Sequence, residues 1–231
     1  MNRKKFLSNA ILGMGGIVTG VACQKNTSSE NTIPNNNGST DSTSSGTCSL
    51  TPTETKGPYP IKTPTELVKA NIISDRAGVA LMINLTIQNT TNCSPLSGYL
   101  VDVWHCDKDG NYSEYGNLTT VHFLRGRQTT DANGKVNFLS IYPGWYSGRA
   151  PHIHVEILSD TGVSKLITQI AFPETINNTV YSTSSLYTKG LADTSNTRDN
   201  IFSDSLSSEL ATLSGNINDG FLLTHKININ I

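Results

Sequence analysis

The sequence predicts an all-β domain, an antiparallel β-sandwich with long loops and little helix. Apolar and polar residues alternate with a period of two in several short segments, which is typical of half-buried strands. Turn-forming pairs such as Ser97-Gly98, Asp109-Gly110 and Asn133-Gly134 separate these segments. No long amphipathic helical pattern is evident, and only Ser205 to Leu213 is expected to form a short helix. These features together favour the sandwich architecture.

Residues 1–22 have the pattern of a signal peptide: a basic start, then a glycine-rich apolar stretch too short to span a membrane. The pair Ala22-Cys23 suggests a lipobox, in which Cys23 becomes the lipidated first residue and anchors the protein to a membrane. Arg3 and Lys4 also resemble a weakened twin-arginine signal, and an ordinary secretory peptide with a coincidental cysteine stays open. We therefore expect an exported lipoprotein of the bacterial cell envelope, at the periplasmic or the outer-membrane face.

Residues 23–47 are expected to form a tether. After Cys23 the segment is almost entirely Ser, Thr, Asn and Gly, and Ile33 is its single aliphatic residue. Such a composition buries too little apolar surface to offset its conformational entropy, so we expect disorder here. Residues 48–231 then form one domain of ordinary size.

Within that domain, four segments show the strand pattern most clearly. Residues 81–87, 100–104 and 153–157 alternate between apolar and polar side chains, and residues 221–231 close the chain with a further candidate strand. The intervening residues 114–122 and 173–202 are expected to be long active-site loops.

The charge of the chain argues against nucleic-acid binding. The formal net charge is −1, and loss of the three basic residues of the signal peptide leaves −4. Because no basic stripe is present, nucleic acid is not expected as a partner.

Apart from Cys23, the cysteines are Cys48, Cys93 and Cys106. One disulfide among these three is plausible outside the cytoplasm, but the sequence leaves the pairing open.

The richest chemistry lies between Ile141 and His154, which contains two tyrosines, an arginine and a His-x-His pair. On a strand, His152 and His154 point to the same face and can aim both imidazoles at one metal ion. The preceding turn-rich loop could bring Tyr146 to the same point. Imidazoles bind Zn, Cu, Fe and Ni alike, whereas a tyrosinate oxygen favours Fe(III). A zinc or copper site on the same histidines is therefore the less favoured alternative.

This stretch resembles the intradiol ring-cleaving dioxygenases, the family of catechol 1,2-dioxygenase and protocatechuate 3,4-dioxygenase, and in particular its exported single-chain bacterial branch. The resemblance covers residues 48–231 and is specific as a set. It is carried, besides the histidine motif, by six further segments: residues 51–60, 101–107, 110–113, 123–126, 130–134 and 166–169.

The resemblance implies a four-residue ligand set for Fe(III), namely Tyr112, Tyr146, His152 and His154. Two phenolates and two neutral imidazoles would cancel two of the three charges of the ion. It also implies that a catechol-like substrate chelates the iron as a dianion and that O2 cleaves the ring between the two hydroxylated carbons to give a muconate-type diacid.

Two further residues match positions of the family that act on the reaction. Arg149 would stabilise negative charge that builds on the ring during oxygen attack. Gln169 would orient a ligand or the oxygen intermediate by hydrogen bonding. The alternative for Arg149 is a structural role in a surface ion pair with a carboxylate. The alternative for Gln169 is a structural role on a strand, with its side-chain amide fully hydrogen-bonded.

Several neighbouring residues are alternatives for the same roles. Tyr115 lies three residues after Tyr112, so a local shift of the ligand position stays open. The other aromatic and histidine residues are interpreted as structural: Tyr142, Trp104, Trp145, His105, His122 and His225. The alternative function is a lipid-anchored binding module that retains the metal cradle without ring cleavage.

Overall fold

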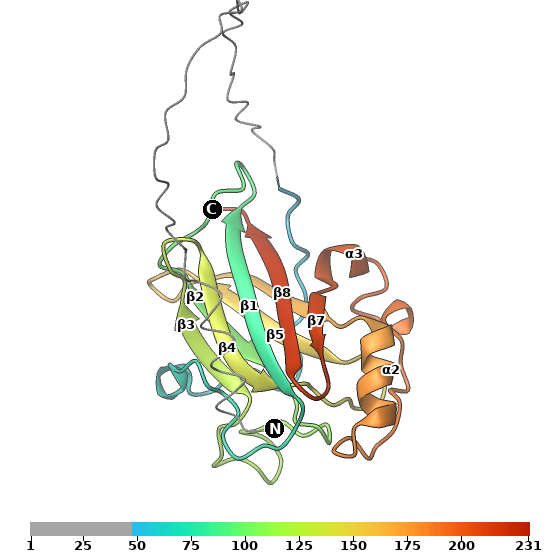
Figure 1. Cartoon of the computed structure of the whole chain (residues 1–231). Helices are drawn as coiled ribbons and strands as arrows, with labels where there is room; N and C mark the ends of the chain where they lie inside the picture. The colour runs from blue at the N-terminus through green and yellow to red at the C-terminus, as the bar shows by residue number, and fades with distance from the viewer. Residues whose placement is uncertain (1–47) are drawn as a thin grey trace, which may run out of the picture. The chain divides into compact units, whose positions relative to one another are not determined.

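The computed structural model describes residues 48–231, so the predicted signal peptide, the Cys23 anchor and the tether lie outside the described residues (Figure 1). Two four-stranded sheets form a sandwich, and the prediction of an all-β fold with little helix is confirmed. Across residues 48–231, none of the helices is both long and apolar enough to cross a membrane.

The first sheet has the strand order β4-β1-β8-β7, and Figure 1 shows it in front. Its strands are β1 (Ala80–Asn89), β4 (Lys135–Ile141), β7 (Thr212–Asn216) and β8 (Gly220–Ile229). The β1/β4 and β7/β8 pairs are antiparallel, as predicted, whereas β1 and β8 run parallel. The last strand of the domain therefore lies beside the first, which ties the two ends of the domain together.

The second sheet has the order β3-β2-β5-β6, with all pairs antiparallel. Its strands are β2 (Leu100–Trp104), β3 (Arg125–Thr129), β5 (His152–Leu158) and β6 (Ser164–Ala171). The four strand segments recognised in the sequence correspond to β1, β2, β5 and β8. The strands β3, β4, β6 and β7 were not assigned from the sequence alone.

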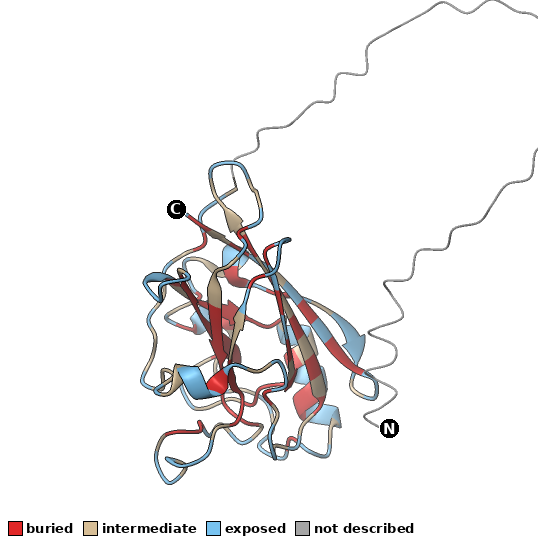
Figure 2. Ribbon diagram, turned by 90° about the vertical axis from the view of Figure 1, so that its left-hand side faces the viewer, coloured by how far each residue is buried: buried red, intermediate tan, exposed pale blue. Residues whose placement is uncertain are grey.

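The core lies between the sheets, and Figure 2 shows its buried residues as red bands along the strands. Alternate residues of β1 from Leu81 to Ile87 are fully buried, while their neighbours are half-buried. On β5, Ile153, Val155 and Ile157 join the same core. The intervening residues of β5, His152 and His154 among them, therefore point to the opposite face of the second sheet.

Helix is confined to the connection after β6 and to short turns. The 3-10 turns are η2 (Pro64–Leu67) and η3 (Asn196–Arg198), and α3 (Leu206–Glu209) falls inside the predicted short helix. The ten-residue helix α2 (Glu174–Thr183) was not predicted. Its threonines and asparagines are weak helix formers, so packing of its buried Asn177, Val180 and Tyr181 against the sandwich stabilises it.

Cys48 forms a disulfide with Cys93, with 5.4 Å between their Cα atoms. This answers the pairing question that the sequence left open. Cys106 is a buried free thiol, and burial raises its pKa to about 12, so it stays protonated. The disulfide ties the start of the described chain to the turn after β1.

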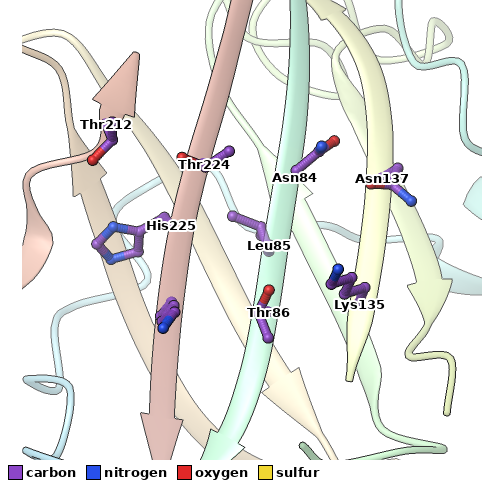
Figure 3. A pocket seen from close by; sticks show the side chains of 9 residues that line it. Asn84, Leu85, Thr86, Lys135, Asn137, Thr212, Thr224 and His225 are labelled. Carbon is purple, nitrogen blue, oxygen red and sulfur yellow. The ribbon is translucent and has the colours of Figure 1, made fainter. Parts of the chain in front are cut away.

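The outer faces of the two sheets differ. The outer face of the first sheet carries a shallow polar hollow of about 360 Å³, lined by Asn84, Thr86, Asn137, Lys135 and Thr224 among others (Figure 3). Residues 54–56 instead contact β5 and β6 of the second sheet, and the carboxylates Asp102 and Glu156 of that sheet are buried.

Candidate active site

His152 and His154 lie at the start of β5 on the covered outer face of the second sheet. Both rings are buried, and their Nε2 atoms are 3.1 Å apart. The alternation predicted from the His-x-His spacing is therefore present, because Ile153 between them is part of the core.

Two tyrosines approach the same point from two different loops. The Tyr146 hydroxyl lies 3.2 Å from His152 Nε2, and the Tyr112 hydroxyl lies 3.5 Å from the same atom. Tyr112 is buried and Tyr146 is half-buried. All four residues of the predicted ligand set thus present an oxygen or a nitrogen to one small volume.

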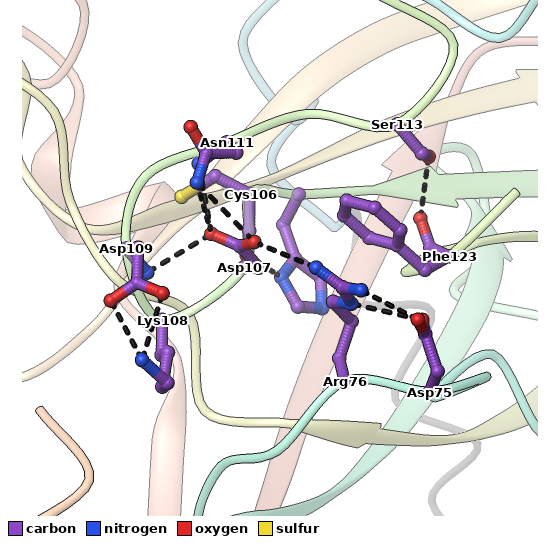
Figure 4. Close-up of polar contacts among 10 residues, drawn as sticks. Asp75, Arg76, Cys106, Asp107, Lys108, Asp109, Asn111, Ser113 and Phe123 are labelled. Carbon is purple, nitrogen blue, oxygen red and sulfur yellow. Dashed lines mark hydrogen bonds and ion pairs between the residues drawn. The ribbon is translucent and has the colours of Figure 1, made fainter. Parts of the chain in front are cut away.

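The loop after β2 aims Tyr112 at this volume, and Asp107 fixes that loop (Figure 4). One Asp107 carboxylate oxygen accepts hydrogen bonds from the backbone N–H groups of Asp109 and Asn111, at 3.0 and 2.9 Å. The fully buried Arg125 donates to the backbone carbonyls of Ser113 and Tyr59. The backbone is therefore fixed on both sides of Tyr112: Asp107 holds residue 111 before it, and Arg125 holds Ser113 after it.

Each histidine ring is oriented by its surroundings. His152 donates its Nδ1–H to the Ala150 carbonyl at 2.6 Å, which leaves the Nε2 lone pair free to bind a metal. The His154 ring stacks on Trp104 with 5.0 Å between centroids and an interplanar angle of 2°. Gly57 closes the edge of that ring, because a Cβ atom there would lie only 3.0 Å from His154 Cε1.

In the absence of a bound cation, the two histidines and the two tyrosines are all uncharged. Burial lowers the pKa of His152 to about 3 and that of His154 well below its usual value, so both imidazoles are neutral. Burial raises the pKa of Tyr112 well above 10 and also raises that of Tyr146. Binding of a cation would favour loss of the phenol protons.

The donor set decides which ions could bind. Within residues 48–231, no group of three or more His, Cys, Asp or Glu side chains could hold a metal ion. A metal at the histidine pair would therefore need the phenol oxygens as further ligands. Two nitrogens and two phenolate oxygens suit a hard, highly charged ion such as Fe(III) better than a zinc or copper site of imidazoles alone.

Arg149 and Gln169 are in direct contact beside the histidines. One Arg149 terminal nitrogen donates to Gln169 Oε1 at 2.7 Å, and Gln169 Nε2 donates to the Thr55 carbonyl at 2.9 Å. Gln169 also pairs with His154 in the register of β5 and β6. The Arg149 Nε–H donates to Asp199 at 2.8 Å. Both residues therefore border the same volume as the four possible ligands.

The structure also separates the alternatives. The Tyr115 hydroxyl donates to the Pro60 carbonyl at 2.7 Å, whereas the Tyr112 hydroxyl reaches the histidines. Tyr142 is a core residue whose hydroxyl donates to Asn177, and His105 is held between the Cys106 carbonyl and the Ser140 hydroxyl.

Trp145 donates its ring N–H to the Gly190 carbonyl. His122 contacts Glu114, and His225 on β8 is half-buried. None of them touches the pair His152 and His154.

Sequence reasoning missed two residues that shape the site. Asp199 lies in a loop fifty residues after Arg149, and nothing local distinguishes it from other loop aspartates. The second residue is Gly57, whose neighbours in the sequence give no sign of its contact with His154. Its positive φ of 66° next to His154 depends on tertiary structure that no short motif encodes.

The geometry defines a β-sandwich with a buried pair of histidines on one sheet and a pair of tyrosines that reach them from two loops. The model of the family described as "Dioxygenase" matches residues 55–200. An intradiol ring-cleavage dioxygenase from Tetranychus urticae shares the fold with a TM-score of 0.72 and 30% identity, over 79% of this chain and 95% of that one. The dioxygenase domain of a carbohydrate-binding fusion protein from Streptomyces sp. SirexAA-E has a TM-score of 0.58 and 26% identity, over 79% of this chain and 99% of that chain.

Curated relatives agree over shorter stretches. A chlorocatechol 1,2-dioxygenase from Rhodococcus opacus is 32% identical over 119 residues, which are 43% of this chain and 46% of that protein. The beta chain of a protocatechuate 3,4-dioxygenase from Burkholderia cepacia is 35% identical over 91 residues, 34% of this chain and 39% of that one. The chain thus matches less than half the length of these curated relatives. It belongs to the dioxygenase family and, within it, to the intradiol ring-cleavage dioxygenases.

Proposed function

We propose that the protein is a non-haem Fe(III) intradiol dioxygenase that cleaves a catechol-type ring between its two hydroxylated carbons. The observation that carries the proposal is the convergence of the Tyr112 and Tyr146 hydroxyls on the His152 and His154 Nε2 atoms. Family membership supports the reaction type, and the donor set supports the metal.

The spacing of the imidazoles fits a shared metal ion. Two nitrogens at about 2.1 Å from one metal and at right angles to each other lie about 3.0 Å apart. The observed separation of the two Nε2 atoms is 3.1 Å. The hydrogen bond from His152 Nδ1 to Ala150 fixes the tautomer in which Nε2 can coordinate. Tyr112, Tyr146, His152 and His154 would hold the ion.

Bound there, Fe(III) would supply Lewis-acid activation of a chelated catechol toward O2. The overall reaction balances without a reductant: the carbon–carbon bond between the two oxygenated carbons breaks, O2 is reduced, and both of its atoms enter the product. A muconate-type diacid results, and neither NADH nor flavin is required.

The side chains around the ligands have separate tasks in this proposal. The half-buried Tyr146 can move more freely than the buried Tyr112, so we assign to Tyr146 the acceptance of a catechol proton. The Arg149 guanidinium is placed to stabilise negative charge on the substrate. Gln169 holds Arg149 in place and borders His154. Trp104 and Tyr59 pack against His154 and Tyr112 and exclude water from the ligands.

Location of the enzyme in the cell envelope is a further prediction. Attachment to a membrane through Cys23 rests on the sequence of residues 1–23 and stays a prediction.

Tyr146→Phe tests the proposal, with Tyr115→Phe as its matched control. Y146F removes one of the two phenolates, so we expect a weaker and shifted ferric charge-transfer absorption, to which Tyr112 still contributes, and about a hundredfold loss of oxygen uptake with catechol, within the range that an interaction at a metal site contributes. Y115F removes a hydroxyl that donates to the Pro60 carbonyl and not to the histidine pair, and it should keep both colour and activity. A Y146F protein with the wild-type absorption spectrum and wild-type activity would refute the ligand assignment.

A further inference from the structure

The carboxylate of Asp199 is buried and accepts hydrogen bonds from two adjacent residues of the histidine loop. Its Oδ2 accepts from Arg149 Nε at 2.8 Å and from the Ala150 backbone N–H at 2.7 Å. Its Oδ1 accepts from the Ile201 backbone N–H at 2.9 Å. Asp199 follows η3, so a loop far along the chain reaches back to the strand that carries His152.

The Ala150 backbone links this contact to the histidine ring, because its N–H and its carbonyl lie on either side of one Cα atom. The Ala150 N–H is held by Asp199, and the Ala150 carbonyl accepts the Nδ1–H of His152 at 2.6 Å. The orientation of that carbonyl decides which nitrogen of His152 carries the proton, and therefore whether Nε2 is free. Ala150 is itself buried against Ala171 and Phe202, which limits other positions for its backbone.

The same carboxylate also fixes the direction of Arg149. The guanidinium is planar, and Asp199 holds its Nε while Gln169 holds one terminal nitrogen at 2.7 Å. Arg149 also interacts with the Tyr146 phenol, both electrostatically and by hydrogen bonding. Arg149 is therefore anchored on two sides.

We propose that Asp199 is a positioning residue that sets both the tautomer of His152, through the Ala150 backbone, and the direction of the Arg149 guanidinium. The part of this inference that concerns Arg149 and catalysis rests on the proposed function. The part that concerns the tautomer of His152 does not, because it is a property of the metal-free protein.

A carboxylate is the side chain that this position requires. Three N–H groups point at its two oxygens, and an ionised carboxylate is an acceptor at both. An asparagine must place its NH2 group against either Ile201 N–H or the two donors from Arg149 and Ala150. Asp199→Asn therefore leaves at least one buried donor facing another donor, with little change in volume.

The chain offers a matched control in Asp102. This buried carboxylate on β2 accepts two hydrogen bonds from Arg127, so it resembles Asp199 in burial and in its partner. Asp102 contacts neither Ala150 nor the histidine pair. Asp102→Asn should reduce stability to a similar degree without changing His152, which separates a positioning role from a purely structural one.

The first measurement is nitrogen–proton correlation NMR of the histidine rings in the metal-free full-length protein, with His152→Gln used to assign the signals. We expect only the Nδ1–H tautomer of His152 in the wild type and in D102N, and a mixture with the Nε2–H tautomer in D199N. A wild-type tautomer in D199N overturns the inference. If D199N does not fold, Asp199→Ser is measured in its place and read in the same way.

The second measurement uses the iron-loaded wild-type, D102N and D199N proteins. D199N should lower kcat by about 10- to 100-fold with a smaller change in KM, because Arg149 acts on charge that develops in the transition state. Unchanged kinetics in D199N beside an active wild type contradict the role of Asp199. A wild type without iron or activity contradicts the proposed function instead, and the NMR result on the metal-free protein still decides the role of Asp199.

Discussion

Gly57 is the residue whose smallest change should disturb the site most directly. Its φ of 66° lies in the left-handed region, and a Cβ added there would meet His154 Cε1 at 3.0 Å. The stacked Trp104 packs against the face of the same ring. Gly57→Ala therefore adds a single methyl group beside a proposed iron ligand whose freedom to move is already limited.

Two effects of this substitution can be separated. An alanine in the left-handed region loses about 1–2 kcal/mol of stability because of its backbone alone. The close contact then requires His154 to shift by a few tenths of an ångström. Since a misplacement of about 1 Å costs about a hundredfold in rate, a shift of this size corresponds to a loss of about four- to tenfold in kcat/KM.

Gly162→Ala separates the two effects. Gly162 also has a positive φ, 82°, but a Cβ there would meet nothing within 4 Å. Both variants should lose comparable stability in urea denaturation, whereas only G57A should lose iron affinity and oxygen-uptake activity with catechol. Equal activity of G57A and G162A would refute the claim that Gly57 leaves room for the His154 ring.

Two further predictions concern stability. Glu209 is buried, and burial raises its pKa from 4.5 to about 7, so its contribution to stability is present below about pH 4.5 and is lost as pH rises through about 7. Glu209→Gln should therefore raise the free energy of unfolding at pH 8, by at most about 3 kcal/mol, and leave it unchanged near pH 4; an equal effect at both pH values would contradict the assignment. Reduction of the disulfide between Cys48 and Cys93, which closes a loop with a sequence separation of 45, should lower the free energy of unfolding by about 4 kcal/mol in urea titrations, and a loss below about 1 kcal/mol would show that other contacts hold this loop.

The strands that the sequence predicts best are those with one buried face. In β1 and β8 apolar residues alternate with polar ones, and both strands were predicted. By contrast, β3 begins with the fully buried Arg125 and contains Gly126, and β7 is polar and mostly exposed. Their strand character comes from pairing with neighbours, so a local pattern could not reveal it. The helix α2 escaped prediction for the same reason, since packing stabilises it more than its composition does.

At the site, short motifs predict functional residues that are close together in sequence. Residues that reach the site from distant segments are found only from the tertiary structure. The spacing of His152 and His154 required only strand geometry, and the structure brings Tyr112 and Tyr146 to the pair as the resemblance implied. Asp199 reaches the site from a distant loop, and the need for Gly57 arises from the position of a ring on another strand. Contacts of this kind depend on the whole fold.

The absorption spectrum of the purified protein, recorded with metal analysis before and after ferric loading and then with catechol under nitrogen, tests the central claim most directly. The proposed site of Tyr112, Tyr146, His152 and His154 predicts one iron per chain and a red-brown tyrosinate-to-iron band that shifts when catechol binds. A protein that stays colourless after ferric loading would contradict the dioxygenase proposal and would favour a binding module that keeps the fold without the reaction.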